Sequence, residues 1–334
     1  MSYVYTVARL RGMETHLLDA AFFSRLIDSS TLEDALKALS ETSYAQWLTQ
    51  TGGEDFDKAI DEELLATCRE LGQFVPDEGL LTLFRMPYDY HNVKVALKSL
   101  FRVRGGDAEG RRHDLLSPLG AFPSEGLVEA IETEEYGRLP YGLADVVPHC
   151  WTLWDQTKNP QAVELLLDHH LFAAMLHIAE GLEMPDVVRW VRHRIDAENL
   201  KSAVRLARMR YDAAKGLPFF HEGGFIRAAD VARLLGEPQE TWGKILSYTD
   251  IGAVLDALQE SSDVQAALSD VSKALDEYLI RVLERVRYST NAPANVLLYL
   301  LTKEAEARNL RIALVCVAGG LSREFSRRLL SHAR

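Results

Sequence analysis

A short polar motif occurs three times in this chain at nearly equal spacing. The copies are Asp89-Tyr-His-Asn92-Val-Lys94, Asp196-Ala-Glu-Asn199-Leu-Lys201 and Ala305-Glu-Ala-Arg-Asn309-Leu-Arg311. Their asparagines are separated by 107 and 110 residues. Apolar residues follow each asparagine at the spacing of one helix face, so each motif is predicted to lie on an amphipathic helix.

A second landmark repeats with the first. Asp61, Asp168 and Asp276 stand 31, 31 and 33 residues before the three asparagines. Two landmarks at matched spacing indicate one unit written three times. The unit is longer than the repeats of common solenoids, which run about 20–50 residues, so each copy is predicted to be a small helical bundle.

The sequence predicts an all-α fold. Helical apolar spacing covers residues 32–39, 57–71 and 79–101, the last with a break expected at Pro87. Period-two alternation is nearly absent, and there is no Asn-Gly or Asp-Gly hairpin turn. The segment Tyr3–Val7 fits either a strand or the first turns of a buried helix.

Two glycine-containing stretches fall at equivalent places in the repeat. Arg104–Arg111 follows the first motif and Lys215–Gly224 follows the second. Such stretches are typical of connections between elements. The predicted units are therefore residues 1–108, 109–215 and 216–334, joined in one compact assembly.

Charge and composition exclude several classes of protein. The formal net charge is −12 and hydrophobic residues make up 47% of the chain, as in soluble globular proteins. The acidic net charge argues against a broad nucleic-acid-binding surface, because such a surface needs a basic face. The C-terminal arginines are better explained as a solvated helix end that complements the helix dipole; they are Arg323, Arg327, Arg328 and Arg334.

Cysteine usage and hydropathy bear on disulfide bonds, zinc binding, secretion and membrane spanning. Cys68, Cys150 and Cys316 are far apart and form no Cys-x-x-Cys, so neither a disulfide framework nor a zinc site is expected. No signal peptide is visible. The apolar tract Leu310–Leu321 is interrupted by Arg311 and is too short to span a bilayer.

No catalytic or cofactor motif stands out. The chain has no phosphate-binding GxxxxGK[ST], no GxSxG nucleophile elbow and no HExxH. His169, His170 and His177 share a short region, but a metal site needs further ligands at suitable spacing. We therefore expect no metal, no cofactor and no catalytic residue. An all-α enzyme with an unrecognised site is the alternative.

The repeated polar residues are expected to be structural. Each asparagine amide (Asn92, Asn199, Asn309) is predicted to satisfy backbone groups of a neighbouring helix, because an unpaired buried polar group is costly. The cations that follow, Lys94, Lys201 and Arg311, are expected to pair with Asp61, Asp168 and Asp276 of the same unit. The third copy departs from the pattern, with Ala305 aligned to Asp89 and Asp196. A ligand-binding role for the asparagines is the alternative.

With these features the chain resembles the C subunit of V-type and A-type rotary ATPases, called the d subunit in eukaryotic vacuolar enzymes. The resemblance rests on Tyr5–Met13, on Leu26-Ile27 followed by Leu32–Tyr44, on the triplicated motif, and on Glu306–Ile312. Together these segments span nearly the whole chain.

The resemblance implies a fold and a task. The fold would be a funnel of three similar helical units about a pseudo-threefold axis. The protein would sit on the cytoplasmic end of the membrane rotor ring, receive the tip of the central shaft and transmit torque. It would neither hydrolyse ATP nor carry ions, and in isolation it would be a monomer. A helical scaffold unrelated to ATPases is the alternative.

Overall fold

The computed structural model describes residues 2–52, 55–107, 110–256 and 264–331, and these form helices joined by loops, with no strand. The longer helices are α1 (Tyr3–Met13), α5 (Phe56–Gly72), α6 (Glu78–Arg104), α8 (Leu143–Thr157), α9 (Pro160–Gly181), α10 (Pro185–Arg208), α15 (Val264–Glu284) and α16 (Asn295–Ala318). The shorter helices are α2 (Ala20–Ile27), α3 (Leu32–Leu39), α4 (Ala45–Gln50), α7 (Ser124–Glu132), α11 (Ala213–Gly216), α12 (Ala228–Leu234), α13 (Trp242–Ile245), α14 (Gly252–Asp256) and α17 (Arg323–Leu329). The predicted all-α class is confirmed.

The chain divides into two compact units. Unit 1 comprises Met1–Phe84 with Ile280–Arg334, and unit 2 comprises Arg85–Leu279. Both crossings between the units lie inside helices, in α6 and in α15. The three-unit division at residues 108 and 215 stays a prediction; its first boundary, like Arg334, lies outside the described residues.

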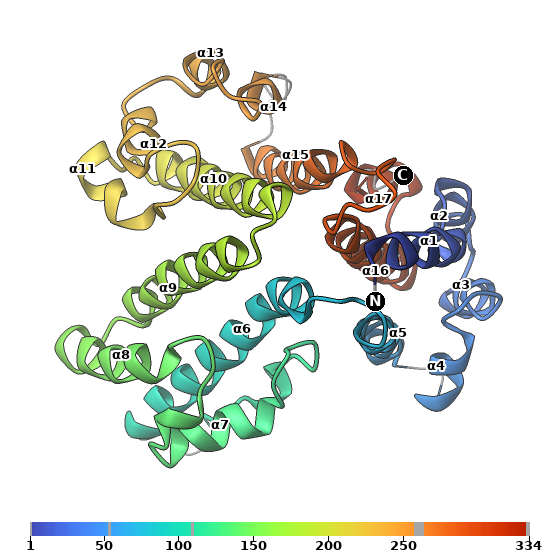
Figure 1. Ribbon diagram of the computed structural model, residues 1–334, viewed down its shortest axis with the longest axis horizontal. Helices are drawn as coiled ribbons and strands as arrows, with labels where there is room; N and C mark the ends of the chain where they lie inside the picture. The colour runs from blue at the N-terminus through green and yellow to red at the C-terminus, as the bar shows by residue number, and fades with distance from the viewer. Residues whose placement is uncertain (1, 53–54, 108–109, 257–263, 332–334) are drawn as a thin grey trace. The chain divides into compact units, whose positions relative to one another are not determined.

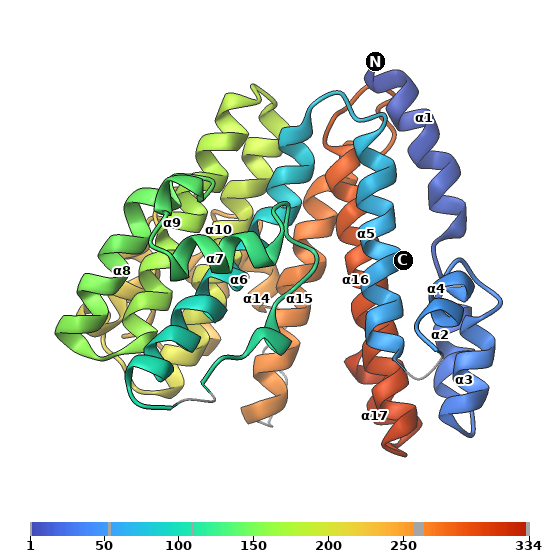
Figure 2. The ribbon, with the colours of Figure 1, turned by 90° about the horizontal axis from the view of Figure 1, so that it is seen from below.

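Unit 1 is organised around α16. This helix contacts α1, α2, α3 and α5, and Figures 1 and 2 both place α5 directly beside it. Sixteen of its residues are buried, so it is the core helix of unit 1, and only its C-terminal half has an exposed face, at Arg308, Val315 and Ala318. Phe22, Leu26, Leu39 and Ile60 from three other helices join Leu310 of α16 in one hydrophobic cluster.

In unit 2, helices that follow one another in the sequence also pack against one another. Helix α9 contacts α8 on one side and α10 on the other, and α10 also contacts α12 (Figure 1). Among the described residues, α9 alone has the length and composition to cross a bilayer, with a mean hydropathy of 1.3. Core helices of soluble proteins meet the same criterion.

Two local expectations are settled by the helices. The segment Tyr3–Val7 opens α1 and is not a strand, because Thr6, Val7 and Leu10 form a buried helical stripe. The break expected at Pro87 does not end the helix, and α6 runs through it. A proline removes one intrahelical hydrogen bond without ending a helix whose neighbours hold it in place.

Candidate functional site: three repeated polar joints

The repeated cations form ion pairs between two long helices. The pairs are Lys94–Asp168, Lys201–Asp276 and Arg311–Asp61. The partners are the predicted aspartates, but they do not belong to the same sequence unit, so that part of the prediction is wrong. In terms of the predicted sequence repeats, the first two cations each pair with the aspartate of the following repeat, and the third cation pairs with the aspartate of the first repeat. The pairing order along the chain is therefore cyclic.

The repeated asparagines fix three loops. The Asn92 amide bonds both backbone groups of Ser117, accepting from its N–H at 2.7 Å and donating to its carbonyl at 2.9 Å. Asn199 does the same with His221 at 2.7 and 2.8 Å, and Asn309 with Ser331 at 2.9 Å for both bonds. The amides satisfy backbone groups as expected, but in downstream loops rather than in a neighbouring helix.

A carboxylate three residues before each asparagine holds the chain that follows. Asp89 accepts from the backbone N–H groups of Ala121 and Phe122, both at 3.1 Å. Asp196 accepts from Phe225 and Ile226, both at 3.0 Å. We call each set of asparagine, carboxylate and ion pair a joint, and number the joints 1 to 3 in the order Asn92, Asn199, Asn309.

Joint 3 corrects the alignment of the third motif. Glu306, not Ala305, lies three residues before Asn309, and its carboxylate accepts from the backbone N–H of Leu18 at 2.6 Å. Joint 3 therefore has a carboxylate at the same position as joints 1 and 2, on a side chain that is one methylene longer. The sequence motif sets Ala305, four residues before Asn309, against the two aspartates, and is therefore one residue out of register.

Glu306 also belongs to a buried charged cluster that the sequence did not reveal. Lys303 lies 2.7 Å from Glu306 and 3.1 Å from Glu63, and Tyr44 donates to Glu306 at 2.8 Å. Trp47 and Ser43 donate to Glu63, at 2.7 Å each. One cation thus serves two buried carboxylates that join α5 to α16. The only sequence signal is a Lys-x-x-Glu pair that follows the apolar first turns of α16, a spacing that is typical of solvated helix faces.

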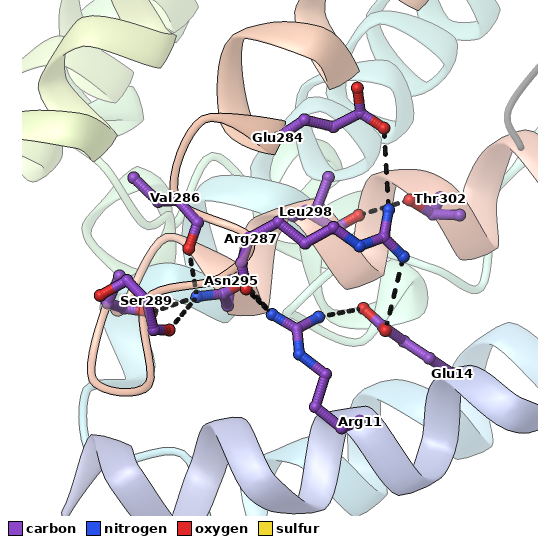
Figure 3. Close-up of polar contacts among 10 residues, drawn as sticks. Arg11, Glu14, Glu284, Val286, Arg287, Ser289, Asn295, Leu298 and Thr302 are labelled. Atoms are coloured by element: carbon purple, nitrogen blue, oxygen red, sulfur yellow. Dashed lines mark hydrogen bonds and ion pairs between the residues drawn. The ribbon is translucent and has the colours of Figure 1, made fainter.

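The N-terminal segment is tied to the start of α16 by a second polar cluster (Figure 3). The Arg11 guanidinium donates to Asn295 at 2.9 Å, to Glu14 at 2.6 Å and to the carbonyl of Arg287. Asn295 in turn donates to the carbonyls of the turn that precedes α16. The family-like segment Tyr5–Met13 therefore contributes an anchor for α1.

The histidines and cysteines have ordinary protein partners. His169 bonds the carbonyl of Pro218 at 3.0 Å and His221 at 2.8 Å, and His170 bonds the Tyr90 hydroxyl at 2.6 Å. All three cysteines are buried and none is in a disulfide. Within the described ranges, no three His, Cys, Asp or Glu side chains are grouped as metal ligands.

A family match covers almost the whole chain. Residues 6–329 match the ATP synthase (C/AC39) subunit family. The chain belongs to this family. The match spans all three joints and the Arg11 anchor, and it agrees with the resemblance carried by the N-terminal and C-terminal segments.

Curated relatives carry the same description. The chain is 22% identical to the C subunit of the V-type sodium ATPase of Enterococcus hirae, over 92% of this chain and 91% of the relative. It is 27% identical to the C subunit of the A-type ATP synthase of Methanocaldococcus jannaschii, over 92% and 81%. It is 30% identical to the C subunit of the V-type ATP synthase of Thermus thermophilus, over 70% and 71%. These similarities support a rotary ATPase component.

Burial shifts the pKa of several joint carboxyl groups of this family member, among them Asp89, Asp168 and Asp196. Burial raises the pKa of Asp196 to about 7, although the N–H groups of Phe225 and Ile226 favour the charged form. Burial likewise raises the pKa of Asp89, and that of Asp168 despite its pairing with Lys94. The carboxylates therefore oppose folding when charged, and their hydrogen bonds offset part of that cost.

Asp196 is expected to give the protein a pH-dependent stability. Its folded pKa lies above the value of about 3.9 for an unfolded aspartate, so the folded state binds the proton more tightly. Its contribution is fully present below about pH 4 and is lost as the pH rises from about 4 to about 7. Urea unfolding should show the stability difference between wild type and Asp196→Asn shrinking over this interval.

The matched control for this titration is Asp230→Asn. Asp230 is paired with Arg227, which lowers the pKa of its carboxyl group. Its stabilising contribution is therefore lost only at lower pH, and the difference from wild type should stay flat between pH 4 and 7. A flat difference for Asp196→Asn as well would contradict the assignment.

Lys201→Ala is expected to destabilise the protein by about 1–3 kcal/mol, because Lys201 is the shared partner of two carboxylates in a largely buried position. It bonds Asp276 at 2.7 Å and Glu198 at 2.8 Å with a side chain that is 12% exposed. Thermal and urea unfolding measure the loss. Lys98→Ala removes an exposed inter-helix pair with Glu164 and should cost at most about 0.5 kcal/mol. Equal losses would show that the joint is worth no more than a surface pair.

Proposed function

We propose that this chain is a non-catalytic central-stalk component of a V/A-type rotary ATPase, joining the central shaft to the membrane rotor ring. Family membership over residues 6–329 carries the proposal, since relatives in the family are named as the C subunits of such enzymes. In this role the chain transmits torque between ATP turnover and the transport of protons or sodium ions.

The cyclic pairing of the joints supports a closed, pseudo-threefold arrangement. The aspartate of each predicted repeat pairs with the cation of the repeat before it, and the aspartate of the first repeat pairs with the cation of the third. Every repeat therefore contributes to two ion pairs, as a closed arrangement of three repeats requires. A closed body of packed helices is stiff, because close-packed interiors have low compressibility. Stiffness is what a part that passes torque between two partners requires.

Charge supports a socket for basic partners. The net charge of −12 favours docking of positively charged shaft or ring surfaces through electrostatic complementarity. In this proposal the chain lies on the cytoplasmic side, bound to the membrane only through the other subunits. The isolated chain is then a monomer, which sedimentation would check.

Native mass spectrometry would test the proposal. The chain is mixed with the cognate shaft subunits and with the detergent-solubilised rotor ring. The expected result is a complex with one copy of this chain bound to both. Lys98→Ala, which alters only an exposed ion pair, should bind equally well. No association with either partner at micromolar concentration and moderate salt would favour an unrelated helical scaffold.

A coupling assay separates torque transmission from simple attachment. Reconstituted complexes without the chain should retain ATP hydrolysis by the catalytic head but lose ATP-driven ion transport. Adding the chain back should restore transport. Full ion transport in its absence would refute the proposed role.

A further inference from the structure

Joint 3 differs from the other two in the connectivity of the chain that it holds. In joint 1, Asn92 bonds Ser117, and Asp89 bonds Ala121 and Phe122. Both side chains, which we call the anchors of the joint, therefore bond the same short continuous loop. Joint 2 repeats this with His221 and with Phe225 and Ile226. In joint 3, Asn309 holds Ser331 near one chain end, whereas Glu306 holds Leu18 near the other.

Release of a segment from its joint depends on whether the two anchors bond one continuous loop or two separate segments. When one anchor of a continuous loop breaks, the second keeps the loop beside its partner at a high effective concentration. Release then requires both anchors to break together. At joint 3 the two anchors hold different segments, so loss of the Asn309–Ser331 contact is not resisted by Glu306.

The segment held by Asn309 is otherwise attached largely through exposed side chains. Of residues 321–331, all of them described, Ser326 alone is buried. Arg323 and Arg327 both pair with Asp28, at 3.5 and 2.8 Å, and Arg323 also donates to the Asp28 carbonyl at 3.1 Å. All three side chains are about half exposed or more, so these contacts contribute little. Leu330 packs against the hydrophobic cluster of unit 1 while remaining partly exposed.

A cavity of about 210 Å³ separates the two chain ends at this joint. It is lined by Leu17, Leu18 and Phe23 on the N-terminal side, by Leu330 and Ser331 on the C-terminal side, and by Glu306 of α16. The cavity leaves part of the contact between the two sides unfilled, so separating them forfeits less attraction than opening a close-packed interface.

We propose that joint 3 is a latch: residues 322–331 detach from α16 and α2 as one unit and reseat, while the loops of joints 1 and 2 stay bound. Opening exposes the cavity, Asn309 and the face of α2 that carries Phe23 and Ile27. This inference concerns the isolated chain and does not depend on the proposed function.

Three chemically matched amides allow a direct test. The N–H groups of Ser117, His221 and Ser331 each donate to the side-chain oxygen of a joint asparagine, at 2.7, 2.7 and 2.9 Å. Native-state hydrogen exchange of the full chain compares them at several low urea concentrations. We expect Ser331 to be at least about 100-fold less protected than His221, with exchange independent of urea because local opening exposes little surface.

Two variants make the test specific to the latch. Asn309→Ala should raise exchange across residues 322–331 by about tenfold and leave Ser117 and His221 unchanged. Arg327→Ala, which is exposed and leaves the core intact, should raise exchange of the same segment by a few-fold without changing the melting temperature. The amides of α17 should respond together with Ser331.

Three outcomes would overturn the proposal. Protection of Ser331 equal to that of His221 would show that joint 3 is as firmly held as joint 2. Exchange of Ser331 that steepens with urea like the most protected amides would show that it opens only by global unfolding. A smooth gradient of exchange that rises from Phe325 to Ser331 would indicate fraying of the chain end rather than release of a unit.

Discussion

Lys303→Ala is expected to destabilise the protein by about 3–5 kcal/mol, because it leaves two buried carboxylates without a cation. Lys303 and Glu306 have side chains that are 4% and 3% exposed, and Glu63 is 11% exposed. Neither carboxylate can turn toward water, since Tyr44 and Trp47 donate to them from within the core. Urea unfolding followed by circular dichroism measures the loss.

The cause of that loss can be separated from general damage to the core. Lys58→Ala changes an exposed lysine on α5, the helix that carries Glu63, and should change stability by less than about 0.5 kcal/mol. Adding Glu63→Gln to Lys303→Ala removes one of the two unpaired charges and should recover part of the loss. A Lys303→Ala variant within about 1 kcal/mol of wild type, or no recovery in the double variant, would contradict the role given to this cluster.

Gly224→Ala should cost roughly 3 kcal/mol through overpacking and a disturbed carboxylate hydrogen bond. A Cβ atom at this position would lie 2.1 Å from Oδ1 and 2.9 Å from Cγ of Asp196. The carboxylate is held on both oxygens by Phe225 and Ile226, so the loop must move instead. Thermal unfolding should show the loss, and Gly120→Ala in joint 1 should behave alike because its Cβ would lie 2.3 Å from Oδ1 of Asp89.

Gly126 provides the control for these substitutions. It lies inside α7, and a Cβ there would meet nothing within 4 Å. Gly126→Ala should therefore be neutral or stabilise by up to about 1 kcal/mol, since alanine is the better helix former. In an Asp196→Ala background, Gly224→Ala should cost much less than in wild type. An undiminished cost there would show that the strain arises elsewhere.

The helices and the joint residues could be read from the sequence because both depend on local spacing. Apolar periodicity predicted α3, α5 and most of α6, and two repeated landmarks selected the asparagines, cations and aspartates that meet in the structure. The helix–strand ambiguity at Tyr3–Val7 arose because five residues are too few to separate a period of two from one of 3.6.

The partners of the repeated residues could not be read in the same way. Repetition makes Asp61, Asp168 and Asp276 equivalent as candidates, so spacing alone does not say which copy a given cation meets. The Lys303–Glu306 pair looks like a solvated helix face until α5 and α4 are packed around it. Both features depend on contacts between segments far apart in the chain, which local spacing does not encode.

The cyclic pairing also bears on the order in which the chain folds during synthesis. The ion pairs of joints 1 and 2 link residues 74 and 75 positions apart, whereas that of joint 3 links residues 250 positions apart. Helices α2 to α5 leave the ribosome well before α16, yet the hydrophobic cluster that they share with α16 cannot close until α16 has been synthesised. Their apolar faces stay uncovered while unit 2 folds, and long-range closure of this kind is slow and prone to aggregation. The N-terminal helices of this protein are therefore where a nascent-chain chaperone would be needed.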